Sequence, residues 1–347
     1  MDRARECIGV PLLIRFGAMG DMILTTPLLR ALAECHGTPC EVIGRGSFVS
    51  ELLINLPFVG SIRTIQSNKT PYILNRPKQL LVDYLRNRPP GPVYLAQSDV
   101  ISHRILEKAG VTATASDLTV ERRVNEHVVD HMARLGGFAD ITGSVSPDYN
   151  RGTELQVTEK EKDHVRRILD RMDFSGRQYV VVQPGFRKCM NKRRRVSKGK
   201  FWPEERWVRL IQEILILSPD KRVLISGNAE EQPLTAGIAD EVNDHRVSDL
   251  TLGLRPMLAL LSMAHSMISL DTGPAHAAAA LNCPLVVLFG KMDPRIIRPL
   301  SRTSPVLVQH GPPGAPLEDD LVGWQKHHSM DDISINTVVT AWASLLV

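Results

Sequence analysis

Residues 267–289 read MISLDTGPAHAAAALNCPLVVLF, and this stretch decides the fold class. Two short, mostly apolar runs, 267–270 and 285–289, flank a segment of small residues that begins with Asp-Thr-Gly-Pro. Apolar runs of this length predict buried strands, and the small residues between them predict a helix over 273–281. A strand–helix–strand unit whose strands are buried on both faces is typical of a parallel sheet.

The same alternation extends through the rest of the second half of the chain. The further strands and helices predicted there are 179–182, 204–217, 223–226 and 257–264. Residues 303–331 are rich in Pro, Gly and His, so we expect irregular structure there, followed by a last helix over 333–346. Residues 142–153 are polar and carry no periodicity, which makes them the best candidate for a linker.

The first half of the chain shows the same pattern. Its predicted strands are 11–16, 41–44, 62–65 and 93–96, and its predicted helices are 22–33, 48–56, 78–87, 103–109 and 127–135. Pro27 leaves two possibilities for the first helix. Either the helix begins at Asp21 and is kinked, or Thr26 caps a helix that has Pro27 in its first position.

We therefore predict an α/β protein built of two domains of similar size, each with a parallel sheet. The 347 residues are enough for two domains of about 150 residues each. The first domain is placed at residues 1–150 and the second at 151–331, and the C-terminal helix 332–347 is expected to join the first. Open parallel sheets bind ligands at the carboxyl ends of their strands, so two facing domains would form a cleft between them.

Composition and cysteine spacing exclude several classes of protein. Apolar residues make up 43% and charged residues 23% of the chain, and a net charge of +4 does not indicate a nucleic-acid binder. There is no clean run of about 20 apolar residues. The five cysteines form no C-x-x-C pair and the histidines no H-E-x-x-H motif, so neither a metal site nor a disulfide framework is expected. A cytoplasmic protein fits best, and attachment to a membrane face stays open.

A glycine turn that carries one carboxylate follows the first predicted strand. Residues 15–21 read RFGAMGD, in which Gly17 and Gly20 allow a tight turn and a close approach of the backbone to a ligand. Asp21 would stand at the start of a helix and point into the cleft. Two interpretations stay open: Asp21 caps the helix, or it takes part in chemistry. The G-x-G-x-x-G pattern of a dinucleotide site is absent.

A second candidate site lies where the strand 267–270 ends and the next helix begins. Thr272 is a plausible cap for that helix, whose free N–H groups would form an anion site suited to a diphosphate. A core helix does not need Asp271, Gly273 and His276 as well as a cap, so we favour a binding function over a purely structural one.

A strongly basic segment separates Pro184-Gly185 from Lys200. Residues 187–200 contain eight Lys or Arg in fourteen positions. Because the segment follows a predicted strand and precedes a helix, we expect it at the rim of the cleft, where its cations would meet phosphates or carboxylates. No aromatic residues for base stacking are interleaved, which argues against a nucleic-acid partner.

Three stretches, in this order, resemble glycosyltransferase family 9, the ADP-heptose:lipopolysaccharide heptosyltransferases. They are IRFGAMGDMILTTPLLRAL (14–32), KFWPEERWVRLI (200–211) and DTGPAHAAAALNCPLVVLFGKMDP (271–294). The resemblance implies a GT-B fold, in which two facing Rossmann-like domains enclose an interdomain cleft. It also implies an acceptor site in the first domain and a nucleotide-sugar site in the second.

The resemblance further implies roles for individual residues. The base aspartate of the family falls on Asp21 and its phosphate-contacting lysine on Lys200, so these two are the expected catalytic residues. The expected donor-binding residues are Gly17, Gly20, Pro184, Gly185, Lys200, Asp271, Thr272, Gly273 and His276. We assign acceptor binding to Arg193, Arg194 and Arg195 of the basic segment. The chain departs from the family at 290–294, where GKMDP stands in place of a pattern close to G-P-T-D-P and the threonine hydroxyl is lost.

The activity implied is inverting transfer of a heptose from ADP-heptose to the inner core of lipopolysaccharide. Asp21 would take the proton of the acceptor hydroxyl, while Lys200 and the helix start at Gly273 would stabilise the leaving diphosphate, with no cofactor or metal. An anionic, lipid-linked acceptor would bring the enzyme into peripheral contact with the cytoplasmic face of the inner membrane. Two alternatives stay open: heptosyl or other glycosyl transfer to a protein or another glycan, and a nucleotide-sugar-binding module without catalysis.

Overall fold

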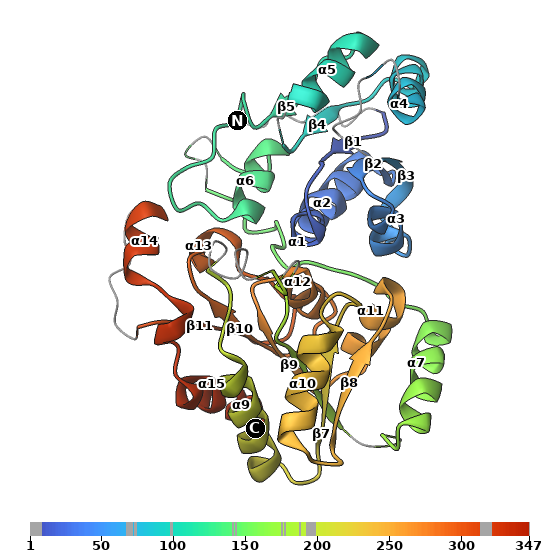
Figure 1. Cartoon of the computed structure of the whole chain (residues 1–347). Coiled ribbons are helices and arrows are strands. Elements are labelled where there is room, and N and C mark those ends of the chain that lie inside the picture. Colours follow the sequence, from blue (N-terminus) through green and yellow to red (C-terminus); the bar gives the residue numbers. More distant parts are fainter. Residues whose placement is uncertain are drawn as a thin grey trace. The chain divides into compact units, whose positions relative to one another are not determined.

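The computed structural model describes residues 9–66, 72, 75–97, 100–140, 142, 144–174, 176, 178–186, 189–191, 199–312 and 321–346. The chain divides into two compact units, Met1–Arg151 and Gly152–Val347. This division falls one residue after the end of the expected first domain. Both units alternate strands and helices along the chain (Figure 1).

Within the described part of the first unit, parallel strands form one sheet in the order β3-β2-β1-β4-β5. The strands are β1 (Leu12–Ile14), β2 (Cys40–Arg45), β3 (Val59–Ile65), β4 (Val93–Leu95) and β5 (Ala115–Ser116). The helices are α1 (Met19–Ile23), α2 (Thr26–His36), α3 (Phe48–Leu53), α4 (Arg76–Asn87), α5 (Val100–Ala109) and α6 (Val128–Leu135). The central strand β1 is buried along its whole length, and its Leu12 and Ile14 share an apolar cluster with α4 and α5.

The region around Pro27 contains two helices. Helix α1 ends at Ile23 and α2 begins at Thr26, so the alternative of one kinked helix is wrong. The residue in the N-cap position is Thr25, one residue before the expected Thr26, and Pro27 lies in the first turn, where its missing N–H is not needed. This short break keeps α1 separate, and α1 is the helix that carries Asp21.

The described part of the second unit contains a larger parallel sheet in the order β11-β10-β9-β6-β7-β8. Its strands are β6 (Tyr179–Gln183), β7 (Arg222–Gly227), β8 (Val247–Thr251), β9 (Ser266–Leu270), β10 (Leu285–Phe289) and β11 (Val306–His310). Its helices are α7 (Glu159–Arg171), α9 (Glu204–Leu217), α10 (Gln232–Val242), α11 (Leu254–Met263), α12 (Gly273–Ala280), α13 (Pro294–Ile297), α14 (Leu321–His327) and α15 (Ile335–Ala343). Strands β6, β9 and β10 are wholly buried, as their apolar sequences predicted.

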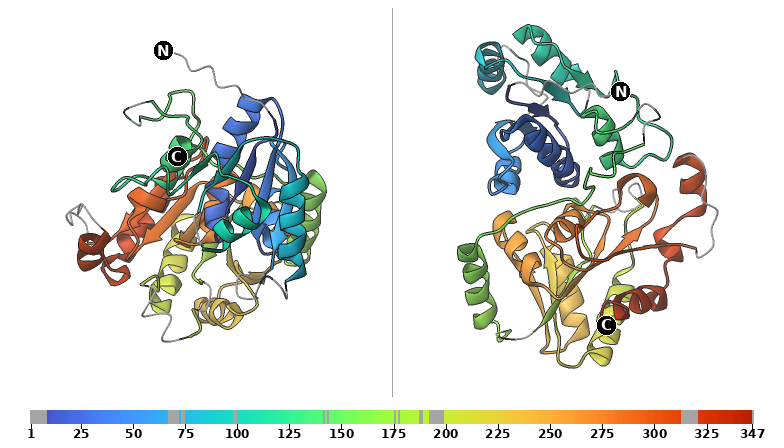
Figure 2. Two further views of the ribbon diagram at one scale, coloured as in Figure 1. Left: turned by 90° about the horizontal axis from the view of Figure 1, so that it is seen from above. Right: turned by 180° about the vertical axis from the view of Figure 1, so that it is seen from behind.

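Helices cover this second sheet on both sides (Figures 1 and 2). On one side α9 packs against α10 and α15, and on the other α11 packs against α7 and α12. Helix α12 consists of small residues and is buried from Ala275 to Ala280, which lets it lie close to β9 and β10. A sheet covered in this way leaves the ends of its strands as the accessible part, and the polar residues collect there.

The C-terminal region differs from two sequence-based expectations. Residues 303–331 are not irregular throughout, because they contain β11 and α14. The last helix, α15, belongs to the second unit and not to the first. Its Val338 and Trp342 are fully buried in the core cluster that also contains Trp207 of α9, and the Trp342 Nε1 donates a 2.9 Å hydrogen bond to the Ser266 Oγ at the start of β9. The apolar face of α15 was evident from the sequence, but the sheet that it covers was not.

This packing predicts that Trp342→Ala destabilises the second unit by about 3–5 kcal/mol, because a large buried side chain and its hydrogen bond are lost. The four tryptophans of the chain all lie in this unit, so tryptophan fluorescence during urea unfolding reports its stability. As a control, Leu217→Ala at the 48% exposed end of α9 should change stability by less than about 0.5 kcal/mol. Equal effects of the two substitutions would contradict the assignment of α15 to this core.

Candidate functional site

Asp21 lies in the first turn of α1, directly after the loop that follows β1. Its Oδ2 accepts a 2.8 Å hydrogen bond from the backbone N–H of Ala18, so Asp21 does cap the helix. Gly17 is required here, because a Cβ at this position would lie 2.4 Å from the Asp21 Cβ. Gly20 is a helical residue of α1 and not part of the turn. The Asp21 side chain is 33% exposed, so its capping bond leaves the carboxylate accessible.

Arg15 is the buried partner of Asp21, and the sequence analysis did not single it out. Its Nη2 donates a 3.0 Å hydrogen bond to the Asp21 Oδ1, and its Nη1 lies 3.4 Å from the Ala96 carbonyl oxygen and 3.7 Å from the Met132 sulfur. Burial lowers the pKa of Arg15, while the charge of Asp21 raises it in opposition. Each carboxylate oxygen of Asp21 therefore has a fixed donor, and the buried guanidinium depends on this counter-charge.

In the second unit, Lys200 and His276 converge on Asp271 at the end of β9. The Lys200 Nζ donates hydrogen bonds of 2.6 Å to the Asp271 Oδ2 and 2.7 Å to its carbonyl oxygen, and the His276 Nε2 lies 3.7 Å from the Oδ1. Burial alone would raise the pKa of Asp271, but the nearby His276 imidazole and the charge of Lys200 outweigh it, so this pKa lies below its usual range. Three residues predicted from two separate motifs thus form one cluster.

The start of α12 provides unpaired backbone donors beside this cluster. Thr272 occupies the N-cap position, as expected, but its hydroxyl lies 3.3 Å from the Leu270 carbonyl oxygen and makes no capping bond. The N–H groups of Gly273 and Ala275 consequently have no side-chain cap, and Pro274 has no N–H to satisfy. A helix start of this kind binds anions, and the 26% exposed Lys200 has a third N–H left for the same anion.

Pro184 and Gly185 follow β6, which is the neighbour of β9 in the sheet. Gly185 packs against Glu231, because a Cβ on Gly185 would lie 2.7 Å from the Glu231 carboxyl carbon. The sequence analysis missed Glu231. It is 3% exposed and accepts hydrogen bonds from the Gln183 side chain at 3.2 Å and the Asn228 backbone N–H at 3.1 Å. Burial raises its pKa, and these two hydrogen bonds oppose the rise. A buried carboxylate at a strand end is a typical partner for sugar hydroxyls.

Lys291 is a second residue near the ends of the strands of this sheet that the sequence analysis did not assign to the site. It follows β10, in the segment that departs from the family pattern. A Cβ on Gly199 would lie 2.4 Å from the Lys291 Cδ, and Gly199 also has a φ of 56°, so only glycine fits there without strain. The Lys291 side chain therefore runs alongside the residue that precedes Lys200. The threonine of the family pattern falls on Met292, and Lys291 stands one residue earlier, at the position of its first proline.

Most of the basic segment 187–200 lies outside the described residues. Arg193, Arg194 and Arg195 lie outside the described residues, so their acceptor assignment stays a prediction. Among the residues that the structure does describe, no group of three or more His, Cys, Asp or Glu is arranged to hold a metal ion. Within the same part of the chain, no helix is both long and apolar enough to cross a bilayer.

Two cysteines of the described part of the chain, Cys40 and Cys283, are unsuited to act as nucleophiles. Cys40, Cys189 and Cys283 are buried and form no disulfide, and burial raises the pKa of Cys40 and of Cys283 to about 12. A thiol with such a pKa carries no appreciable thiolate at neutral pH. Cys35 is disulfide-bonded, which the spacing of the cysteines did not predict.

Two Rossmann-like units with parallel sheets, and with polar residues gathered at the strand ends, have the architecture of the GT-B class. The chain belongs to glycosyltransferase family 9, the heptosyltransferase family, whose model matches residues 107–318. The predictions of the family, of the α/β GT-B fold and of a transferase are therefore confirmed. The match includes Lys200, Asp271 and His276, whereas Asp21 lies before it.

Individual relatives agree with this assignment. The chain is 31% identical to a lipopolysaccharide heptosyltransferase 3 of Escherichia coli over 150 residues, which are 40% of this chain and 38% of that protein. It is 22% identical to the lipopolysaccharide heptosyltransferase 3 of Escherichia coli strain K12 over 323 residues, 81% of this chain and 82% of that one. The structure is similar to that of the Escherichia coli ADP-heptose lipopolysaccharide heptosyltransferase II, with a TM-score of 0.74, 20% identity and coverage of 97% and 98%. At this identity the structural match concerns the fold.

The lowered pKa of Asp271 predicts a pH-dependent contribution to stability. Such a carboxylate stabilises the fold above its unfolded-state pKa of about 3.9, and this contribution is lost as the pH falls through the folded-state value. Asp271→Asn should therefore lower the free energy of unfolding of the second unit by about 1.5–3 kcal/mol at neutral pH. The difference from wild type should shrink as the pH falls below about 4.

Urea unfolding followed by tryptophan fluorescence over a series of pH values measures this difference. The exposed Asp240→Asn on α10 is the matched control and should show no such trend. A difference between Asp271→Asn and wild type that stays constant into acid would mean that the pairing with Lys200 does not stabilise the fold.

Proposed function

We propose that the chain is an inverting heptosyltransferase that transfers heptose from ADP-heptose to the inner core of lipopolysaccharide. The observation that carries this proposal is the cluster of Lys200, Asp271 and His276 beside the uncapped start of α12. A lysine and free helix N–H groups at one strand edge suit a diphosphate. A solved protein of the same fold is an ADP-heptose lipopolysaccharide heptosyltransferase, which supports this donor.

The donor site is proposed to stabilise the departing nucleotide. When the bond between the sugar and the diphosphate breaks, negative charge grows on the diphosphate oxygens. Lys200 and the N–H groups of Gly273 and Ala275 would be in place before this charge develops, so they lower the barrier without a cost of reorganisation. Glu231 would accept hydrogen bonds from the ribose hydroxyls, since it lies buried at the end of the adjacent strands.

Asp21 is proposed as the base that receives the proton of the acceptor hydroxyl. In direct displacement this hydroxyl attacks the anomeric carbon from the face opposite the leaving diphosphate, which inverts the configuration. Each oxygen of Asp21 accepts one hydrogen bond in the free protein, and its remaining lone pairs can accept the acceptor hydroxyl. Arg15 then serves as a positioning residue that fixes the carboxylate.

The acceptor is assigned from the charge of the basic segment and from the relatives. We assign Arg193, Arg194 and Arg195 to an anionic acceptor and to peripheral contact with the cytoplasmic face of the membrane, because eight cations in fourteen residues need anionic partners. Two relatives are named lipopolysaccharide heptosyltransferases, which supports a lipopolysaccharide acceptor. Transfer to a protein or another glycan is the alternative within the fold. Release of ADP only when an acceptor is present would distinguish an enzyme from a binding module.

Lys200→Ala should weaken the binding of ADP about 10- to 100-fold, because a charged hydrogen bond to the diphosphate is lost. Calorimetry with ADP alone measures this effect without an acceptor. The exposed Lys160→Ala on α7 has the same change of charge and should leave ADP affinity unaltered. An unchanged affinity of Lys200→Ala would show that this lysine serves only Asp271.

Asp21→Asn should lower kcat by about 10²- to 10⁴-fold while ADP affinity stays the same, because the base is lost and the donor site is untouched. The substitution also removes the counter-charge of buried Arg15, so a loss of stability could mimic a loss of catalysis. The double variant Arg15→Met/Asp21→Asn removes both charges. It should regain stability but not kcat, and recovery of kcat would reduce Asp21 to a structural partner of Arg15.

A further inference from the structure

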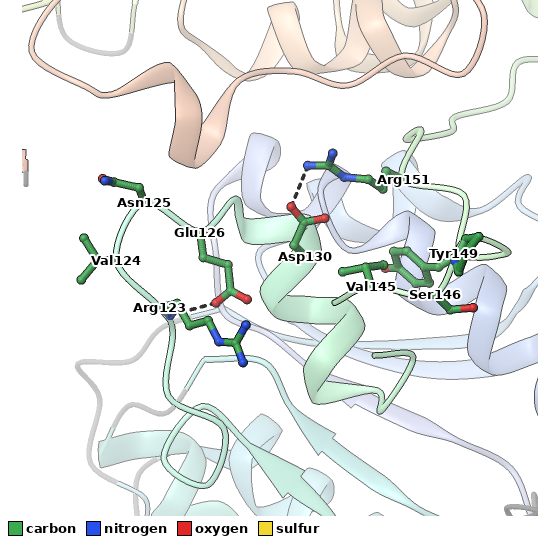
Figure 3. A pocket seen from close by; sticks show the side chains of 10 residues that line it. Arg123, Val124, Asn125, Glu126, Asp130, Val145, Ser146, Tyr149 and Arg151 are labelled. Atoms are coloured by element: carbon green, nitrogen blue, oxygen red, sulfur yellow. Dashed lines mark hydrogen bonds and ion pairs between the residues drawn. The ribbon is translucent and has the colours of Figure 1, made fainter. Parts of the chain in front are cut away.

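Buried polar atoms without a hydrogen-bond partner among the described residues are found in both units. In the first unit two of them, the Tyr149 hydroxyl and the Asp130 Oδ1, belong to residues that line a cavity of about 580 Å³ (Figure 3). In the second unit two of them are imidazole nitrogens, the His310 Nδ1 and the His328 Nε2, whose rings lie 5.1 Å apart. Imidazoles change their charge near neutral pH, so this second pair can respond to pH.

The two imidazoles pack against Trp324 of α14. The indole ring is fully buried and stacks on the His328 ring, with 3.5 Å between the centroids and 4° between the planes. The His310 ring, at the end of β11, lies 5.2 Å from the indole at an angle of 60°. The His328 Nδ1 is 3.0 Å from the Trp324 carbonyl oxygen, which can only accept, so Nδ1 carries the proton of the neutral ring and the buried Nε2 is bare.

Trp324 also holds the backbone at the end of β10. Its Nε1 donates a 2.9 Å hydrogen bond to the Gly290 carbonyl oxygen. Gly290 in turn lies directly against Gly199, because a Cβ on Gly290 would clash with the Gly199 carbonyl oxygen. Gly199 immediately precedes Lys200, so the indole anchors the backbone against which the donor-site lysine is placed.

The segment that follows α14 holds the other side of Lys200. The Trp202 Nε1 donates a 3.0 Å hydrogen bond to the Ile333 carbonyl oxygen. Met330 packs against Gly290, since a Cβ on Gly290 would lie 2.8 Å from the Met330 Cγ. Loss of the Trp324 contact would therefore leave the backbone around Lys200 with fewer anchors.

The charges near the imidazole pair do not favour a protonated ring. Burial lowers the pKa of His310, the charge of His328 lowers it further, and Asp293 opposes this. Asp293 is itself fully buried and already paired with Arg295, at 2.6 Å between its Oδ2 and the Nη2. Strand β10 and helix α15 also pack on β11 and carry no charged side chain. The other charged or titratable groups of the neighbouring elements are Asp332 of the 3-10 helix η2 (Met330–Asp332), which lies against Gly311, and Lys326 and His327 of α14.

We propose that Trp324 is a positioning residue for the donor site and that His310 and His328 make its placement pH-dependent. With both imidazoles neutral, the indole holds Gly290 and thereby keeps Lys200 in place for the diphosphate. A displaced stack binds protons more readily than the buried one, so the stack loses stability as the pH falls below about 6.5 and donor binding weakens. This deepens the proposed function and rests on it only for the identity of ADP as the ligand of Lys200.

Trp324→Phe keeps an aromatic ring in the stack and removes the donor to Gly290. ADP affinity at neutral pH, measured by calorimetry on the full chain, should fall about 3- to 10-fold. Trp342→Phe is the matched control, because it removes a hydrogen bond of the same 2.9 Å length at the start of β9, the opposite edge of the sheet. It should lower stability in urea but leave ADP affinity unchanged. An ADP affinity of Trp324→Phe equal to that of wild type would overturn the proposal.

The double variant His310→Phe/His328→Phe keeps both rings and removes both titrating groups. The Trp324 carbonyl oxygen still accepts the backbone N–H of residue 328, at 3.1 Å. Between about pH 7.5 and about pH 5.5, wild type should lose at least about 3-fold more ADP affinity than this variant. His276 is present in both proteins, so its own titration cancels in the comparison. The exposed His164→Phe on α7 should keep the wild-type profile, and equal losses in wild type and the double variant would overturn the role of the imidazole pair.

NMR titration of the imidazoles in wild type tests the same coupling without a substitution. Because coupling is reciprocal, saturating ADP should move the titration of His310 or His328 to lower pH by about 0.5 unit. Titrations of both rings that are unaffected by ADP would contradict the coupling. These results are separable from the donor site itself: an unchanged ADP affinity of Lys200→Ala contradicts the proposed function, whereas a loss in Lys200→Ala without one in Trp324→Phe contradicts only the role of Trp324.

Discussion

Parallel strand pairing is the constraint on which both units depend. Every strand of a parallel sheet leaves it at the same edge, so residues that follow neighbouring strands come together although they are far apart in the chain. In the second unit this brings Gly185 after β6, Glu231 after β7 and Asp271 after β9 to one edge. In the first unit it places the carbonyl of Ala96, after β4, within reach of Arg15, after β1. Burial of the strands on both faces leaves this edge as the natural place for chemistry.

The same constraint explains which elements the sequence predicts. Central strands such as β10 are covered on both faces, so they admit only apolar residues and are easily recognised. Strand β11 lies at the edge of its sheet, is half-buried and contains Gln309 and His310, so its pattern is ambiguous. Helix α7 buries only two residues and is absent from the predicted helices, although Thr158 and Glu161 form a capping box at its start. The hydrophobic pattern of the sequence is therefore a poor guide to a strand or helix that other elements bury only in part.

Site residues divide in a similar way. Asp21 and Asp271 stand in short motifs beside glycines, and Lys200 precedes a Trp-Pro pair, so the sequence alone singled them out. Glu231 gains its place only by contact with the segment after β6, 48 residues from Gln183, and no local motif signals it. Lys291 likewise gains significance only from its approach to Gly199. Contacts between distant segments are what local spacing cannot supply.

The position of α15 has a consequence for how the protein is made. This helix completes the core of the second unit, and its Trp342 is tied to the start of β9. In contrast, synthesis of the described strands of the first unit is complete once Ser116, the last residue of β5, has been added. Domains tend to fold in the order in which they leave the ribosome, so the first unit can fold early. The second must wait with part of one apolar sheet face uncovered until α15 emerges, and this interval is when the nascent chain has most need of a chaperone.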